Sequence, residues 1–453
     1  MVCVGVGAAI GSGVFRTPGD VAALIHSPWW ILVIWLVAGL ITLMQSLVTA
    51  ELATRFPRAG GEYQFLKEAY GEFAAFFFGW SVTVFIIGGG AATIAAALGD
   101  FAVELFDVRR PGGSAAFGCA AIAAVVVVNA LGLRSGALAQ NCLSMLKVAA
   151  LALVAGGAIL VSGRIWPAPA PIEATPAAPL SLNTLLLALL PAFWSYAGVT
   201  DAAKLAEETR DVRRALPRAL VATVAIMTLV YVFYNYALLC AMSPNEMAGR
   251  AGVHAAVFEG VAGTGIAASL LVISILVCLG SISSVFLANV RVTFALARDG
   301  LTFRRLARMS AGQAPIGSLL VCAAVAVSFL LVRGFEQILR IYFMASTILF
   351  GLTYASLIVF RLRDRRAGRA FPAAAYRAPA GVLQAVALVL LEIAIAVSII
   401  AGDVRTWTDP DTPNTYDSLT TLALLVAMAL LYRLWKGSNR DTNDGPQGRA
   451  RIN

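Results

Sequence analysis

Long apolar runs recur along the whole chain and are separated by short segments rich in polar and basic residues. A run of about 20 apolar residues is long enough for a helix to cross the ~30 Å hydrocarbon core of a membrane. The pattern therefore predicts an all-α protein with twelve membrane-spanning helices. Their expected ranges are residues 2–24, 29–56, 71–98, 115–131, 139–161, 182–206, 219–241, 265–295, 316–332, 338–360, 382–400 and 419–432.

Composition and charge agree with this pattern. Hydrophobic residues make up 59% of the 453 residues and charged residues only 13%, which leaves too little polar surface for a soluble protein of this length. The net charge of +9 does not indicate a nucleic-acid partner, because the basic residues lie in short loops between apolar runs. Most of these residues fall on one side of the predicted topology. This asymmetry predicts a multi-pass protein of the inner or plasma membrane with both termini in the cytoplasm.

Two of the apolar runs contain segments that interrupt a helix. In the first run, Gly11 and Gly13 each lower helix stability by about 1 kcal/mol relative to alanine, and the Ser12 hydroxyl competes for backbone hydrogen bonds. Small residues also suit the contact face between two packed helices, so this segment alone leaves both interpretations open. The sixth run contains a second interruption at Trp194–Val199, shortly after Pro191.

The positions of these two interruptions predict a repeat. They lie in the first span of each of two sets of five spans, and five is odd, so the second set enters the membrane in the opposite orientation. Paired interrupted helices of this kind point to a substrate site near the membrane midplane. The predicted domains are a first repeat (1–161), an extracellular Pro/Ala-rich loop (162–181), a second repeat (182–361), two further helices (362–436) and a disordered cytoplasmic tail (437–453).

Several motifs resemble those of the amino acid–polyamine–organocation superfamily. Each is weak alone, but they occur in the right order and at the right spacing from residue 4 to about residue 380. The resemblance implies the five-plus-five inverted-repeat fold of that superfamily, with interrupted helices one and six and two additional C-terminal helices. The motifs are Ala9–Pro18, Glu51–Tyr63, Gln140-Asn141 with Lys147, Glu207–Asp211 with Leu216–Ala219, and Arg298–Gly300.

The resemblance also implies which residues bind the substrate. Backbone N–H groups of Gly11, Ser12 and Gly13 would hold the carboxylate of an amino acid, because the start of a helix offers free donors. Carbonyl groups of the two interruptions would hold its ammonium group, and Trp194 would close over the occupied site as a gate. The residues expected to supply these carbonyls are Ala9, Trp194, Ser195 and Ala197.

Lys147 is an ionisable residue inside the fifth predicted span. Such a residue costs about 2.5–3.5 kcal/mol on insertion and suggests function by default. In the resembled superfamily a lysine here takes the place of a sodium ion, which implies sodium-independent transport and makes Lys147 a candidate for proton coupling. The alternative is a lysine that extends to the membrane interface and has no role in transport.

The sequence thus predicts a secondary active transporter for amino acids that works by alternating access. The small residues expected to line the side-chain pocket include no carboxylate, which favours neutral amino acids over cationic ones. An exchanger or proton-coupled carrier of cationic amino acids or polyamines is the alternative, and an intramembrane enzyme is a remote one. We expect no cofactor, no metal, and no disulfide-linked subunit. The pocket candidates are Gly88–Ala91, Cys278–Ser284 and Ala345–Thr347.

Overall fold

The computed structural model describes residues 11–57, 61–108, 110–130, 136–168, 180–200, 211–308, 315–373, 375–408 and 415–443, and every regular element in these ranges is a helix. The first half of the chain forms α2 (Gly13–Arg16), α3 (Pro18–Leu24), α4 (Pro28–Arg55), α5 (Glu62–Tyr70), α6 (Glu72–Ser81), the π-helix η1 (Val82–Gly89), α7 (Gly90–Phe106), α8 (Gly113–Ala130), α9 (Gly136–Ser162) and α10 (Leu182–Tyr196). The second half forms α11 (Val212–Ala241), α12 (Pro244–Met247), α13 (Val253–Ala262), α14 (Thr264–Arg298), the 3₁₀ turn η3 (Arg304–Ala307), α15 (Ile316–Val332), α16 (Phe335–Arg366), α17 (Gly381–Thr408) and α18 (Asp417–Asn443).

Seven helices in the described ranges are long and apolar enough to cross a membrane. They are α4, the continuous helix from α6 through η1 to α7, α8, α11, α14, α16 and α17. Shorter apolar stretches lie in α9, α10 and α15. All of these helices coincide with predicted spans, and α15 has the predicted bounds. The third span is longer than predicted, because it continues past Leu98 to Phe106.

The structure differs from the sequence prediction outside the long spans. The predicted loops contain the additional helices α5, α12 and α13, and His254 lies in α13. The tail expected to be disordered from residue 437 is helical as far as Asn443. The polar sequence after Lys436 marks the end of the apolar surface, but an existing helix extends at little cost through polar residues.

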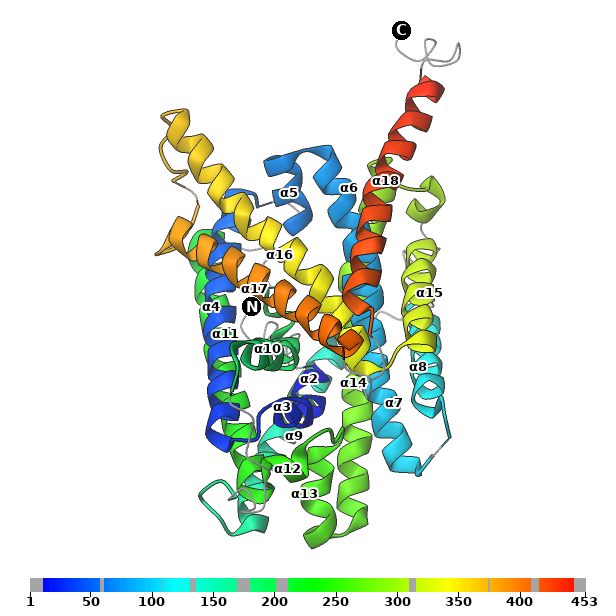
Figure 1. The fold of residues 1–453 in the computed structure, drawn as a ribbon. Helices are drawn as coiled ribbons and strands as arrows, with labels where there is room; N and C mark the ends of the chain where they lie inside the picture. Colours follow the sequence, from blue (N-terminus) through cyan, green and yellow to red (C-terminus); the bar gives the residue numbers. More distant parts are fainter. Residues whose placement is uncertain are drawn as a thin grey trace.

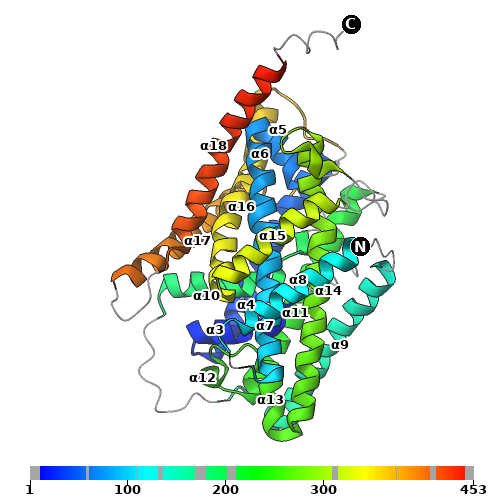
Figure 2. The same ribbon diagram turned by 90° about the vertical axis from the view of Figure 1, so that its right-hand side faces the viewer.

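The short helices α2, α3 and α10 lie at mid-height among the long helices (Figures 1 and 2). Helices α12 and α13 lie at one end of the molecule, which we call the α13 end. Helix α5 and the C-terminal ends of α16 and α18 lie at the opposite end, which we call the α5 end (Figure 1). Because α10 packs against α2, α3 and α4, the two interrupted segments predicted from the sequence meet in the middle of the molecule.

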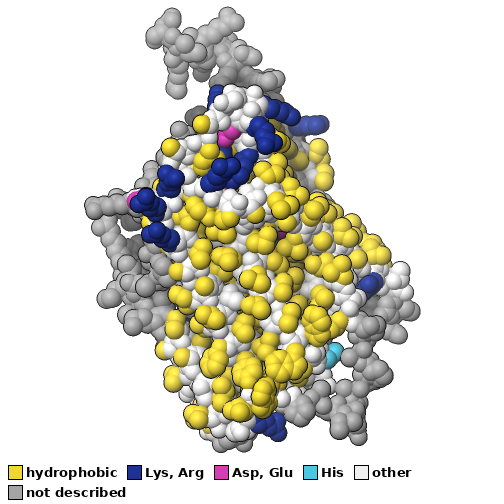
Figure 3. Space-filling model, turned by 90° about the vertical axis from the view of Figure 1, so that its left-hand side faces the viewer, with side chains coloured by type: hydrophobic (Ala, Val, Ile, Leu, Met, Phe, Trp, Pro, Cys, Tyr) yellow, Lys and Arg dark blue, Asp and Glu magenta, His cyan; other side chains and the backbone are white. Residues whose placement is uncertain are grey.

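The surface of the molecule is apolar over most of its height. Figure 3 shows a broad field of hydrophobic side chains, with basic side chains gathered mainly toward the α5 end. Large apolar residues such as Leu160, Leu229 and Leu383 are more than two-thirds exposed. In water such a surface would drive association, whereas hydrocarbon solvates it. The exposed apolar side chains therefore form the kind of surface that contacts lipid in a membrane protein.

A buried charge cluster fixes the α5 end. The Glu51 side chain near the end of α4 is fully buried. Its carboxylate accepts hydrogen bonds from the Arg361 guanidinium, with Nε at 3.0 Å, and from the Ala378 N–H at 2.8 Å. Arg55 Nε lies 3.3 Å from the same carboxylate, a contact that the spacing of four residues along one helix allows. The cluster thereby connects α4, α16 and the segment that precedes α17.

We expect Glu51→Ala to destabilise the protein by about 3 kcal/mol, because it leaves buried guanidinium groups without their carboxylate. Thermal unfolding in detergent checks this expectation, with Arg361→Ala and the double variant completing a mutant cycle. The double variant should lose much less than the sum of the two single losses. Additive losses would show that Glu51 and Arg361 do not act as a pair.

Candidate functional site

The first interrupted segment enters a helix at Gly13. Hydrogen bonds from Arg16 N to Ser12 O (3.1 Å) and from Thr17 N to Gly13 O (2.8 Å) begin a helical path that continues through α3. Ser12 is 2% exposed, so this helix start lies inside the protein. The first N–H groups of a helix have no acceptor within it. The Gly11–Gly13 segment is therefore at the position where the sequence placed free donors, whereas Ala9 lies outside the described residues.

The second interruption follows directly after Tyr196. Helix α10 continues through Pro191 and ends when Ala197 turns to an extended conformation with ψ of 139°. Gly198 then has φ of +93°, a left-handed conformation that strongly favours glycine. The helix is thus interrupted within the predicted segment Trp194–Val199. Lys204, Glu207 and Glu208, which follow this interruption in the sequence, lie outside the described residues.

Gly13 and Ser195 form the contact at which the two interrupted segments meet. A Cβ atom placed on Gly13 would lie 2.7 Å from the Ser195 Cα and 3.0 Å from its nitrogen, so only glycine fits. Around this contact the Thr17 hydroxyl donates to the Gly13 carbonyl at 2.9 Å and lies 3.0 Å from the Ser195 hydroxyl. The Tyr231 hydroxyl of α11 donates to the Ser195 carbonyl at 2.9 Å. Three helical elements are therefore joined at one point.

Two of the carbonyl groups expected to bind the substrate ammonium already accept hydrogen bonds. The Trp194 carbonyl accepts from the Ala197 N–H at 3.2 Å, and the Ser195 carbonyl accepts from Tyr231. Each carbonyl has a second lone pair, so both retain capacity for a further donor. These internal bonds hold the interrupted backbone in place inside the protein.

Lys147 lies in the interior and not at the membrane interface. It is 1% exposed, and its ammonium group donates to the Ser281 hydroxyl of α14 at 3.4 Å. The alternative of a lysine that extends to the interface is therefore wrong. Its expected contact with the unwound part of the first helix falls on residues before Gly11, outside the described part, as do the side chains of Gln140 and Asn141.

The predicted pocket residues divide into two groups. Gly90 faces the side chains of Trp194 and Tyr342, and Ser281 contacts Lys147, so both lie beside the candidate site. Gly88 instead packs against Val325, and Ala345 packs with Phe85, Leu425 and Met428, away from the site. Gly90 and Ser281 thus contact other predicted site residues, whereas Gly88 and Ala345 serve helix packing.

A charged cluster that the sequence analysis missed lies one turn after Gly13. Arg16, 6% exposed, contacts the Asp20 carboxylate at 2.6 Å and the Asp100 carboxylate of α7 at 3.3 Å. Its guanidinium also lies 4.4 Å from the centre of the Phe335 ring of α16. The spacing of Arg16 and Asp20 by four residues inside an apolar run was the available signal. The cluster joins α2 and α3 to α7 and α16.

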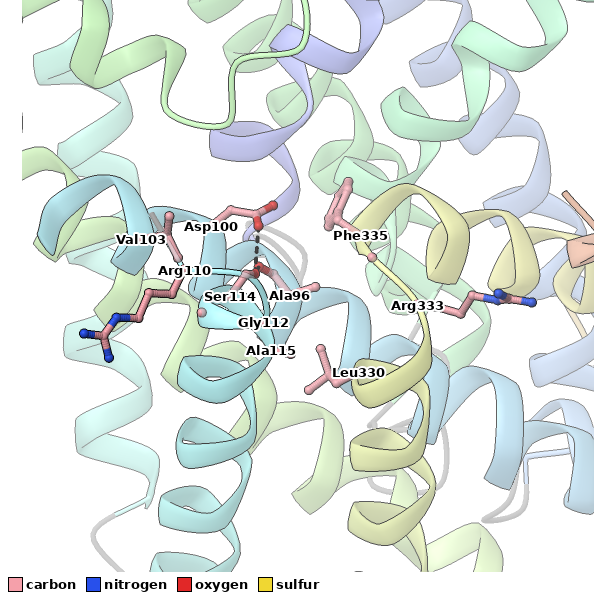
Figure 4. Close-up of a pocket in the computed structure, with 12 residues that line it drawn as sticks. Ala96, Asp100, Val103, Arg110, Gly112, Ser114, Ala115, Leu330, Arg333 and Phe335 are labelled. Atoms are coloured by element: carbon pink, nitrogen blue, oxygen red, sulfur yellow. Dashed lines mark hydrogen bonds between the residues drawn. The ribbon is translucent and has the colours of Figure 1, made fainter. Parts of the chain in front are cut away.

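A cavity of about 320 Å³ opens beside this cluster (Figure 4). Asp100 of α7 faces Ser114 of α8, which donates to it at 2.8 Å, and Phe335 lies opposite them. The side chains of Arg110 and Arg333 turn away from the cavity centre (Figure 4). Asp100, which lines the cavity, also contacts Arg16 at 3.3 Å, so the cavity adjoins the charged cluster.

Helix α13 covers the Phe15 side of the first interrupted segment. Its residue His254 is buried between the rings of Phe15 and Phe101 at centroid distances of 5.4 and 5.7 Å. Its Nε2 lies 2.9 Å from the Ser274 hydroxyl. Burial lowers the pKa of the His254 imidazole to about 4, so the ring is neutral at pH 7.

Among the described residues no group of His, Cys, Asp and Glu side chains is arranged to hold a metal ion.

Comparison with known proteins identifies the family. A family model described as amino acid permease matches residues 1–430. The serine/threonine exchanger SteT of Bacillus subtilis (strain 168) is 30% identical over 387 residues, which cover 82% of this chain and 84% of SteT. The b(0,+)-type amino acid transporter 1 of Mus musculus is 26% identical over 370 residues, covering 80% of this chain and 74% of that protein.

A third relative is the large neutral amino acids transporter small subunit 2 of Oryctolagus cuniculus. It is 29% identical over 364 residues, which cover 79% of this chain and 68% of that protein. The resemblance inferred from the motifs is therefore confirmed. The prediction that the protein is a transporter and not an enzyme is confirmed as well, because the matching family is a family of transporters. Because the family model matches nearly the whole chain, this protein belongs to the amino acid permease family of the amino acid–polyamine–organocation superfamily and is a multi-pass membrane protein.

Proposed function

We propose that this protein carries neutral amino acids by alternating access, independently of sodium, through a site where its two interrupted helices meet. The observation that carries the proposal is the contact between Gly13 and Ser195. It brings the start of one helix, whose first N–H groups have no acceptor within that helix, next to the C-terminal end of another. These two poles match the carboxylate and the ammonium of one amino acid.

The fold we propose for this carrier is a five-plus-five inverted repeat with twelve spans. The first repeat comprises the interrupted first span through α9, and the second comprises α10 through α16. Helices α17 and α18 follow the repeats. The basic residues at the α5 end support a cytoplasmic position for this end and for both termini. The α13 end would then face the outside.

Two features support neutral substrates. The residues that adjoin Trp194 and Lys147 (Gly90, Tyr342 and Ser281) carry no carboxylate to pair with a cationic side chain. The buried ammonium group of Lys147 would disfavour a second positive charge nearby. The names of two relatives also point this way, because one exchanges serine and threonine and the other transports large neutral amino acids. Exchange of cationic amino acids or polyamines is the competing possibility.

Lys147 supports sodium independence. Its ammonium group supplies a fixed positive charge inside the bundle, bonded to α14 through Ser281. A sodium ion at the same place would supply the same charge. Exchange and proton coupling are distinguished in the liposome assay described below by preloading with unlabelled substrate and by imposing a pH gradient, one at a time.

Purified protein in liposomes should take up labelled serine, alanine or leucine, and replacing sodium with choline should leave the rate unchanged. We expect Lys147→Ala to lower the rate at least tenfold, because the fixed buried charge is lost. Lys67→Ala is the matched control, since its side chain is 42% exposed and its pair with Asp299 lies at the surface. A panel that shows arginine or agmatine as the preferred substrate would contradict the neutral assignment, and dependence on sodium would contradict the role of Lys147.

Gly13→Ala should reduce transport at least tenfold, because the added methyl group overlaps the Ser195 backbone and forces the two interrupted helices apart. Gly156→Ala in α9 provides the control, because nothing lies within 4 Å of the added atom. Uptake and thermal stability are measured for both variants. Normal transport by Gly13→Ala would show that close approach at this position is not required.

A further inference from the structure

The Trp194 side chain does not stand alone over the candidate site. Its ring meets the Tyr342 ring of α16 edge to face, with centroids 5.0 Å apart and planes at 86°. Both residues are 7% exposed. The arrangement is the favourable T-shaped geometry of aromatic pairs. Tyr342 therefore holds the Trp194 ring in place, and it comes from α16, which is not one of the two interrupted helices.

Both rings lie against the backbone of α7. A Cβ atom placed on Gly90 would lie 3.6 Å from Tyr342 Cε2 and 3.9 Å from Trp194 Cη2, which is ordinary contact distance. There is room for one carbon atom at Gly90, but a larger side chain would push against the two rings. Gly90 thus determines how far the aromatic pair can move toward α7.

Local contacts fix the backbone next to each of the three residues Gly90, Tyr342 and Trp194. Before Gly90 the chain forms the π-helix η1, and a π-helical turn changes the register of the helix that follows. The Ser346 hydroxyl donates to the Tyr342 carbonyl at 2.7 Å within α16. Ser195, next to Trp194, is fixed by its contact with Gly13. Three helices therefore place the two rings and Gly90 together.

We propose that Tyr342 is a positioning residue for the Trp194 lid, and that Tyr342 with Gly90 limits the size of the substrate side chain. The proposal rests on the proposed function, because it assumes that Trp194 closes over a bound amino acid. The contact with Tyr342 stabilises the closed position of Trp194 and so lowers the free energy needed to close the lid. Movement of either ring away from α7 narrows the space left for a substrate side chain.

The first test compares Tyr342→Leu with Tyr342→Phe. Removing one aromatic pair should raise the KM for leucine about two- to tenfold, with kcat within twofold of the wild-type value. Tyr342→Phe keeps the ring and should restore the wild-type KM. A purely structural role would lower the amount of folded protein and leave the KM of the folded fraction unchanged, so melting temperatures are measured in parallel.

The second test compares Gly90→Val with Gly89→Val. Both add the same branched side chain to neighbouring positions. Gly89 falls in the range predicted to line the pocket, but in the structure a Cβ atom there faces the Val84 carbonyl and Phe329 and not the aromatic pair. Gly90→Val should raise the KM for leucine at least fivefold relative to the KM for alanine. Gly89→Val should leave this ratio within twofold of wild type.

Two results would overturn the proposal: an unchanged KM ratio in Gly90→Val that transports alanine, or equal KM values for the Leu and Phe variants at Tyr342. Both comparisons require wild-type protein that transports amino acids. If wild-type protein transports none of the panel, the proposed function fails instead, so the two failures are distinguishable.

Discussion

The contact between Gly13 and Ser195 holds the two interrupted helices together in the interior of the protein. A membrane allows an interrupted helix only where protein surrounds the interruption. Here the two interrupted segments contact each other, α10 also packs against α4 and α17, and the hydroxyl groups of Thr17 and Tyr231 bond to the carbonyls at the junction. The position must be glycine because the two backbones approach so closely.

The buried charges are arranged around this junction at different distances. Lys147 of α9 contacts Ser281 of α14, and the Arg16 cluster lies one turn beyond the junction between α2 and α7. Glu51 and Arg361 join α4 to α16 at the α5 end. Breaking a buried pair is costly, so each pair resists separation of the helices that it joins. A carrier that alternates between two states must break or move such contacts, and the Arg16–Asp100 pair adjoins the cavity.

Much of the fold was predictable from the sequence because membrane spans are read from local composition. The bounds of α15, the interruption after Trp194 and the buried position of Lys147 follow from apolar length, glycine and the cost of a charge in hydrocarbon. The roles of Tyr342 and Asp100 were not predictable, because each depends on contact with a residue far away in the chain. A tyrosine or a small residue in a span looks the same whether it lines a site or packs against a helix. Gly88 and Gly90 show this directly, since only Gly90 faces the aromatic pair.

A structure determined with saturating serine or leucine tests the central claim most directly. We predict the amino acid between Gly11–Gly13 and Trp194, with its carboxylate at the backbone N–H groups and its side chain toward Tyr342 and Gly90. An amino acid bound instead in the cavity between Asp100 and Phe335, with the junction of the interrupted helices empty, would contradict it.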